Sequence, residues 1–250
     1  MTIWLIPAFF ATALLYASVG FGGGSTYNAL LSLAGFDYRL LPIISLCCNV
    51  VVVSGGTIRF ARAGVVPWKG ALVLSAIAAP LAFLGGYTPI REATFLILLG
   101  LSLIAAGLAL FLPRADDAAS GPAPAARWVW LASAPLGYLA GLVGIGGGIF
   151  LAPLLHFTRW AQGKAIAATT SLFILINSLA GLYGQASKHG AGVFGEALGG
   201  ALPLLVAVVL GGQLGSQLAI RLLPERMIRW LTAALTIWAG GQLLWKQLLA

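Results

Sequence analysis

Long apolar runs, separated by short polar turns, dominate the pattern of hydrophobic and polar positions along the chain. A helix needs about 20 apolar residues to cross a membrane, because the hydrocarbon layer is about 30 Å thick and each helical residue advances about 1.5 Å. The strict alternation of apolar and polar residues that marks a transmembrane barrel strand is absent from these runs. The pattern predicts eight membrane segments, at residues 3–35, 40–60, 69–88, 92–112, 128–158, 164–185, 196–222 and 226–248.

The composition requires the same class of fold. Of the 250 residues, 60% are hydrophobic and only 8% are charged, whereas a soluble domain carries about 25% charged residues. Because every backbone polar group must be satisfied internally in a bilayer, the sequence predicts an all-α integral membrane protein. The net charge of +8 comes from Lys and Arg in the short turns, where they orient helices and meet anionic lipid. Without a basic cluster interleaved with aromatic residues, no nucleic-acid partner is expected.

The chain divides into two similar halves. Residues 113–127, rich in Pro, Gly, Ala and charge, predict an exposed linker between a first four-helix repeat at 1–112 and a second at 128–250. The first segment of each half would be about 50 Å long as one ideal helix, too long for a straight crossing. Each contains a G-x-G-G-G motif, at Gly20–Gly24 and Gly144–Gly148, which predicts glycine-broken first and fifth helices. Such repeats are typical of secondary transporters.

The relative orientation of the two halves has two interpretations. With eight crossings the repeats are parallel, and Lys and Arg then divide evenly between the two sides, so the positive-inside rule does not decide the orientation. Alternatively, each glycine-broken segment is re-entrant, the number of crossings per half is odd, and the repeats are inverted. The number of segments favours the parallel arrangement.

The two glycine motifs are the strongest candidates for a binding site. Consecutive glycines cost a helix about 1 kcal/mol each relative to Ala, and unwound backbone is tolerated in a membrane only where protein or a cavity surrounds it. Each break presents the N-terminus of a half-helix, whose bare N–H groups and partial positive charge can bind an anion. Ser25 and Thr26 are expected to cap the first half-helix; the alternative role of both motifs is close helix packing. The candidate residues are Gly22, Gly23, Gly24, Ser25, Thr26, Gly146, Gly147 and Gly148.

Polar residues in the second helix of each half are expected to line the same pocket, although Ser and Thr can instead bond to their own helix. Arg59, near the end of its helix, is a candidate for guiding an anion at the mouth of the pocket, or it snorkels to headgroups. Asp and Glu are absent from the depths of all segments, which argues against a cation site or a carboxylate proton relay. The pocket candidates are Ser45, Cys48, Asn49, Thr169, Thr170, Ser171 and Asn177.

Enzymatic chemistry finds little support in the sequence. There is no Ser/His/Asp set, no HExxH and no Walker loop, and the glycine motifs do not follow a strand as a dinucleotide-binding motif would. Cys47 and Cys48 are neighbours and form no zinc site by themselves. We therefore expect no enzyme, no catalytic residue, no metal site and no cofactor.

Several motifs, in their order and spacing, resemble the TauE/SafE family of small bacterial permeases, the sulfite exporters. They are Gly144-Ile-Gly-Gly-Gly148, Ala167-Ala-Thr-Thr-Ser171 and Arg221-Leu-Leu-Pro224, with Gly20-Phe-Gly-Gly-Gly24 in the first half, and together they span essentially the whole chain. The halves differ, since Ala29 stands where the second half has Pro153. The resemblance implies secondary transport of a small sulfur oxyanion or an organosulfonate.

We thus expect a multi-pass permease of the bacterial plasma (inner) membrane for a small anion such as sulfite. Its partners are the anion and the lipid bilayer; a coupling ion, proton or sodium, and a homo-oligomeric state are compatible with this expectation. Two alternatives stay open: a thiol-based sulfur or electron carrier that uses Cys47 and Cys48, and a membrane subunit without a pore.

Overall fold

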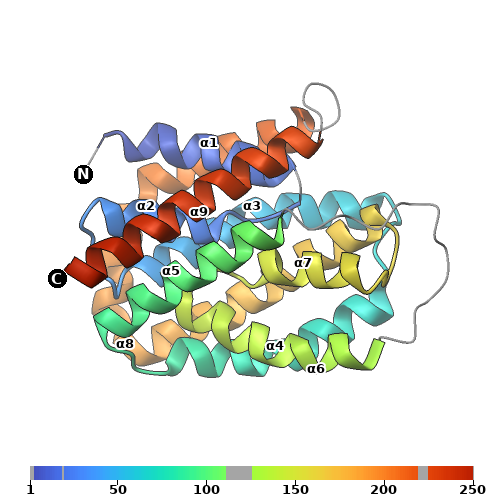
Figure 1. Ribbon diagram of the computed structural model, residues 1–250, viewed down its shortest axis with the longest axis horizontal. Coiled ribbons are helices and arrows are strands. Elements are labelled where there is room, and N and C mark those ends of the chain that lie inside the picture. The colour runs from blue at the N-terminus through green and yellow to red at the C-terminus, as the bar shows by residue number, and fades with distance from the viewer. Residues whose placement is uncertain (1–2, 19, 111–125, 219–224, 250) are drawn as a thin grey trace.

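The computed structural model describes residues 3–18, 20–110, 126–218 and 225–249, and the regular elements in these ranges are helices (Figure 1). The predicted linker falls largely outside the described residues. Within α8, Gly190 has non-helical angles of φ 73° and ψ 178°, and the chain reverses its direction there (Figure 1). The helices are α1 (Leu5–Ser18), α2 (Gly24–Leu33), α3 (Leu41–Arg62), α4 (Trp68–Tyr87), α5 (Glu92–Ala109), α6 (Ala126–Val143), α7 (Gly148–Phe157), α8 (Gly163–Leu218) and α9 (Glu225–Leu249).

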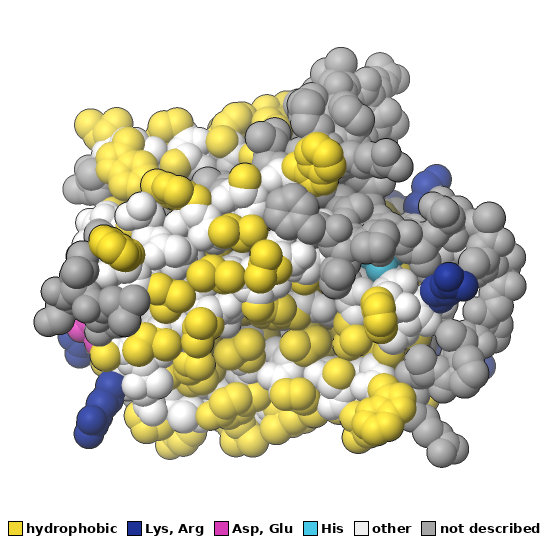
Figure 2. Space-filling model, viewed as in Figure 1, with side chains coloured by type: hydrophobic (Ala, Val, Ile, Leu, Met, Phe, Trp, Pro, Cys, Tyr) yellow, Lys and Arg dark blue, Asp and Glu magenta, His cyan; other side chains and the backbone are white. Residues whose placement is uncertain are grey.

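The helices carry the apolar surface of a multi-pass membrane protein. Figure 2 shows hydrophobic side chains across the middle of the visible face, with Lys and Arg at its two ends. Exposure of so continuous an apolar surface to water is unfavourable, whereas contact with lipid is not. Among the described residues, the helices long and apolar enough to cross a bilayer are Leu41–Arg62, Trp68–Tyr87, Glu92–Ala109, Gly163–Gly190 and Gly192–Gly215. Shorter apolar helices are Leu5–Ser18, Trp128–Val143 and Gly148–Phe157.

Both glycine motifs break the helix where the sequence predicts, and they do so by the same geometry. Gly20 and Gly144 adopt left-handed angles, with φ of 82° and 76°. Such a residue after the last helical turn lets the next N–H bond back to an earlier carbonyl and so terminates the helix. The bonds are Phe21 N to Tyr16 O at 2.9 Å and Ile145 N to Ala140 O at 3.1 Å.

Each broken segment is a hairpin rather than one long crossing. The ring of Tyr27 on α2 stacks on Phe9 of α1, with 4.7 Å between centroids, which a straight helix through both residues would forbid. Gly147 likewise lies against Ala140 and Leu136 of α6. The structure therefore folds each long segment back on itself, as the re-entrant alternative expects, and the number of membrane crossings in each half stays a prediction. The reason is tertiary, since the second piece packs along the first instead of continuing its axis.

Close backbone contacts hold the hairpins to neighbouring helices. A Cβ on Gly141 of α6 would collide with the Ala82 carbonyl of α4, and a Cβ on Gly215 of α8 would collide with the Leu14 carbonyl of α1. Small residues at helix interfaces allow such approach in membranes, where burial of apolar surface drives no association. Gly141 and Gly215, outside the two motifs, thus serve packing.

Candidate functional site

Asn49, on α3, joins the two glycine breaks at the centre of the bundle. Its amide lies so close to the backbone that a Cβ on Gly22, Gly24 or Gly146 would collide with it. Gly22 and Gly24 belong to the first break and Gly146 to the second, so one fully buried side chain contacts both halves. The two motifs, far apart in the sequence, therefore form one site.

The surroundings of the two breaks correspond across the halves. Ile174 of α8 holds the place that Asn49 holds in α3, and it packs on Gly146 and Gly148. The same exchange occurs about two helical turns away: Gly20 lies against Ala167, whereas Gly144 lies against Pro42. The two halves thus present similar backbones but different side chains to the centre, with an amide on one side and a hydrocarbon on the other.

Several buried polar atoms around the breaks lack hydrogen-bond partners among the described residues. They include both amide atoms of Asn49, the hydroxyl of Ser178 beside Gly146 and the hydroxyl of Thr170, a residue whose methyl group lies against Gly148. A buried polar group without a partner costs about 1–3 kcal/mol, so native proteins rarely leave several together without a ligand or an ordered molecule to satisfy them. This cluster therefore points to a polar guest.

The half-helices α2 and α7 start at this cluster. Gly23 and Gly147 are their N-caps, with φ of 86° and 75°, and the first intrahelical bonds run to the carbonyls of these two residues. By helix geometry the first N–H groups of each helix have no intrahelical acceptor, and they carry partial positive charge. Two such ends beside an amide and two hydroxyls form a group of neutral donors that suits a small anion.

The prediction that Ser25 and Thr26 cap α2 is wrong. Gly23 is the N-cap, without a side-chain cap bond. Because the left-handed turn ends at this residue, Ser25 and Thr26 already lie inside the first helical turn. The Thr26 hydroxyl pairs instead with the Tyr16 hydroxyl at 2.8 Å and ties α2 to α1. Ser25 is buried in the same turn.

Two of the predicted pocket residues brace the site without an open hydrogen-bonding group. Ser45 of α3 donates to the Gly24 carbonyl at 2.6 Å and holds the start of α2. Ser171 of α8 bonds Thr57 of α3 at 3.0 Å and links the two central helices. Cys48 of α3 is also fully buried.

Other predicted residues point elsewhere. Thr169 and Asn177 donate to carbonyls of their own helix, at Ala165 (2.8 Å) and Phe173 (2.9 Å). Arg59 lies about 15 Å along α3 from Asn49, as ten residues of helix require. Its guanidinium donates to Gln213 Oε1 of α8 at 3.2 Å, so it is not part of the central cluster.

Ser178 belongs to the polar residues of the second helix of the second half that are expected to line the pocket, and it follows Ile174 by one helical turn. Tyr27 was not among the predicted site residues. The Tyr27 hydroxyl is buried beside Gly23 without a partner among the described residues. Its position in the first turn of α2 is the only sequence signal for it.

A lipid-facing helical bundle in which two unwound glycine segments meet at buried polar groups has the architecture of a membrane transporter. The chain belongs to the sulfite exporter TauE/SafE family, whose model matches residues 5–243. It is 32% identical over 248 residues to the probable membrane transporter protein y4hK of Sinorhizobium fredii, covering 97% of this chain and 98% of that one. It is 23% identical over 237 residues to the probable membrane transporter protein MJ0441 of Methanocaldococcus jannaschii, covering 89% of this chain and 88% of that one. No solved structure matches the chain.

Proposed function

We propose that the protein is a secondary transporter for a small anion, a sulfur oxyanion such as sulfite or an organosulfonate, and that the anion binds at Asn49 between the two glycine breaks. The observation that carries this proposal is the fully buried Asn49 amide, unpartnered among the described residues and in contact with both breaks. The family description supports the choice of a sulfur oxyanion. The site would bind with the N–H groups of α2 and α7, the amide, and the hydroxyls of Thr170 and Ser178.

The chemistry of these groups favours an anion over a cation. Helix N-termini, an amide N–H and hydroxyls donate hydrogen bonds. In the segments that the structure describes, Asp37, Glu92 and Glu196 lie at helix ends or in turns rather than at the breaks. A cation would meet the positive ends of two helix dipoles without a compensating carboxylate. An anion would accept hydrogen bonds from these unpartnered donors.

The two halves, 1–112 and 128–250, are proposed to be inverted repeats that alternate access to this site. Figure 1 shows α1 and α6 running in opposite directions, as do α3 and the first part of α8. The exchanged contacts, Gly20 with Ala167 and Gly144 with Pro42, are those expected of a pseudo-two-fold axis in the membrane plane. Rocking of one half against the other would open the Asn49 site first to one side and then to the other.

Uptake into proteoliposomes tests this function. Purified protein in liposomes should accumulate radiolabelled sulfite, with taurine and methanesulfonate as competitors and protein-free liposomes as the control. Imposed proton and sodium gradients, applied separately, identify the coupling ion. If no tested anion enters faster than in protein-free liposomes under either gradient, the proposed function is wrong.

A further inference from the structure

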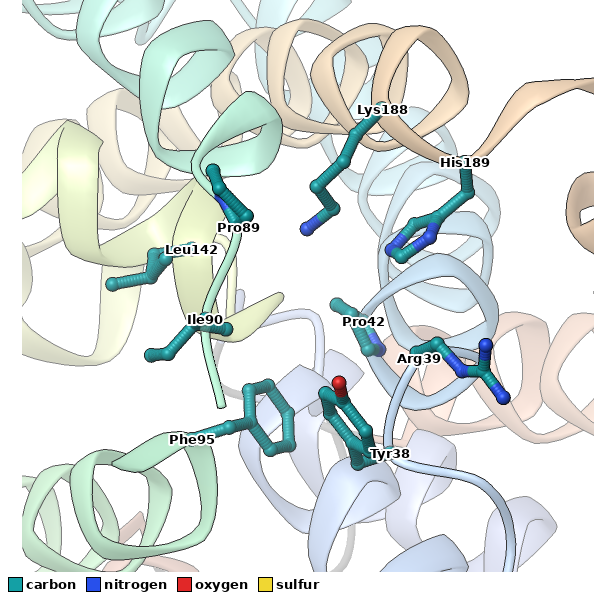
Figure 3. A pocket seen from close by; sticks show the side chains of 9 residues that line it. All are labelled: Tyr38, Arg39, Pro42, Pro89, Ile90, Phe95, Leu142, Lys188 and His189. Carbon is teal, nitrogen blue, oxygen red and sulfur yellow. The ribbon is translucent and has the colours of Figure 1, made fainter. Parts of the chain in front are cut away.

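A cavity of about 120 Å³ opens at one end of the bundle, away from the central site. In Figure 3 the Lys188 ammonium points into it, and the ring of His189, the next residue on α8, and the Tyr38 hydroxyl, from the turn before α3, face it. The opposite wall is apolar. The lining residues that the argument uses are Tyr38, Ile90, Phe95, Leu142, Lys188 and His189.

The positive charge of this cavity comes from Lys188 rather than from Arg39. Arg39 points away from the opening in Figure 3 and pairs with Asp37, with 2.6 Å between Nη2 and Oδ2. Lys188 donates to the Thr88 carbonyl at 3.4 Å. Within the described part of the chain it has no carboxylate at salt-bridge distance. The ammonium is therefore available to an anion.

The cavity adjoins the second glycine break. Pro42 lines the cavity and also packs against Gly144, the residue that terminates α6. Leu142, in the last turn of α6, lines it as well. Asn28 of α2 donates to the Val143 carbonyl at 2.6 Å beside the same turn. The cavity and the second glycine break thus share the end of α6 and Pro42 as neighbours.

We propose that this cavity is a second anion site, which holds an organic anion with a short apolar group before it reaches Asn49. The acidic head, a sulfonate or another oxyanion group, contacts Lys188, His189 and Tyr38. The apolar group lies against Ile90, Phe95 and Leu142, a wall that a bare inorganic oxyanion could not use. The role of this site on the transport path rests on the proposed function, but its binding of an anion does not.

Binding to the purified protein tests the site directly. Thermal unfolding in neutral detergent, titrated with ethanesulfonate and with sulfite, gives an apparent affinity for each. The titrations use an Asn49→Asp background, which blocks the central site. Adding Lys188→Gln should weaken both at least tenfold, and adding Ile90→Ser should weaken ethanesulfonate more than sulfite. Arg91→Gln, an exposed cation at the same end that does not line the cavity, should change neither. Equal affinities with and without Lys188→Gln in this background would overturn the proposal.

Two further measurements distinguish this proposal from a lipid site and from the proposed function. A lipid phosphate offers the same chemistry, so the titration is repeated in nanodiscs of phosphatidylcholine with and without phosphatidylglycerol. A response to phosphatidylglycerol and none to ethanesulfonate would overturn the proposal in favour of a lipid site. Uptake assays complete the distinction: transport with an unchanged KM in Lys188→Gln refutes the cavity site alone. Ethanesulfonate binding that requires Lys188, without any transport, supports the site and refutes the proposed function.

A second inference concerns the orientation of the protein, and it rests on the distribution of charge between the two ends. At one end, here the basic end, the exposed cations are Arg62, Lys69, Arg159 and Lys164. These residues belong together because Gly70 lies against Trp160 and the neighbouring Val66 and Ala71 pack with Ala168 and Leu172. The other end, the mixed end, holds the cavity described above.

Acidic residues distinguish the mixed end. Every Asp and Glu whose side chain the structure describes lies there, together with fewer cations. These acidic residues are Asp37, Glu92 and Glu196. Figure 2 shows the acidic side chains at the end where α1 begins and α9 finishes in Figure 1. Lys and Arg accumulate on the cytoplasmic side of membrane proteins. We infer that the basic end faces the cytoplasm and that the mixed end, with its anion cavity, faces outward.

Cysteine labelling tests this orientation. In a background of Cys47→Ala and Cys48→Ala, single cysteines are introduced by Arg62→Cys and by Arg91→Cys. A membrane-impermeant maleimide should label the Arg91→Cys protein in intact spheroplasts and the Arg62→Cys protein only after permeabilisation. The reverse pattern, or equal labelling of both in intact spheroplasts, would overturn the inference.

Discussion

Asn49 and Gly146, which belong to opposite halves of the chain, lie in contact at the centre of the bundle. Asn49 is fully buried, and its amide atoms have no hydrogen-bond partner among the described residues. Because the amide contacts both glycine breaks, movement of either half changes its contacts. The proposed transport cycle depends on this contact.

Replacement of the amide by a carboxylate should block transport without unfolding the protein. In Asn49→Asp, the fixed negative charge lies at the N-termini of α2 and α7, which stabilise it. The same charge competes with the substrate for these donors. Sulfite uptake should fall at least tenfold, and the melting temperature should stay within a few degrees of the wild-type value. The control is Ser75→Ala, which removes a buried hydroxyl bonded to its own helix at Ala71 and should leave uptake unchanged. Wild-type uptake in Asn49→Asp would exclude a central role for Asn49.

The left-handed glycines of the breaks should be needed for function beyond their effect on stability. Gly147 has φ of 75°, and Gly64, in the turn between α3 and α4, has φ of 67° with open space around it. Ala at either position costs about 1 kcal/mol in backbone strain. At Gly147 the new Cβ would also press on Phe173 and Leu136. Uptake should be lost in Gly147→Ala and retained in Gly64→Ala. Equal uptake in the two variants would mean that the break has no role in transport.

The thiols should be dispensable. Cys48 is fully buried, and Cys47 is nearly so, so Ala at both positions removes little beyond two small buried groups. Uptake by the Cys47→Ala/Cys48→Ala variant should be within about twofold of the wild-type rate, since neither thiol contacts a glycine break in the way that Asn49 does. A loss of more than tenfold, in protein that still inserts and unfolds cooperatively, would favour the sulfur or electron carrier over the anion site.

The ion pair at the mixed end should make a small, pH-dependent contribution to stability. The Arg39 guanidinium, through its hydrogen bonds, holds the pKa of Asp37 below its ordinary value. Because the folded-state pKa is the lower one, the contribution is present above the unfolded value near 3.9 and disappears as the pH falls through the folded pKa. Melting temperatures of wild type and Arg39→Gln should therefore differ slightly at pH 6 and converge as the pH falls below the folded-state pKa of Asp37. A gap that persists at low pH would show that Arg39 acts through something other than Asp37.

Much of the fold could be predicted because its signals are local. Helix bounds follow from hydropathy, and the breaks follow from three consecutive glycines, so the segment predicted at residues 40–60 lies within one residue or two of α3 (Leu41–Arg62). The direction of the chain after each break could not be predicted, because it depends on contacts such as the stacking of Tyr27 on Phe9. With the hairpins in place, the basic end holds Arg62, Lys69, Arg159 and Lys164, whereas Arg39, Arg91 and Lys188 lie at the mixed end.

The sequence predicts the residue types around the breaks more than their partners. Asn49 is a candidate because of its place in the second helix, but its contact with both breaks depends on how α3 packs in the bundle. Thr169 and Asn177 carry the right chemistry and yet bond to their own helix. Hydroxyl and amide groups in membrane helices have this choice, and the sequence does not show which one they make.

Exchange of the central residues between halves tests the repeat and the site together. Asn49→Ile removes the amide, and Ile174→Asn places one at the corresponding position of α8, where it would face Gly146 and Gly148. Ile is the larger side chain, so each single variant changes the packing at its own position, whereas the double exchange conserves the combined volume of the two positions. If the halves are related by a pseudo-two-fold axis, the transplanted amide meets the same pair of breaks from the other side.

The double variant should therefore regain much of the activity that Asn49→Ile loses. Uptake should fall at least tenfold in Asn49→Ile and recover to within about fivefold of the wild-type rate in Asn49→Ile/Ile174→Asn. Ile174→Asn alone is the matched control for an added buried amide, and melting temperatures of all three variants separate loss of folding from loss of transport. A well-folded double variant as inactive as Asn49→Ile would show that the amide must stand on α3, and that the halves, although similar in backbone, are not interchangeable at the centre.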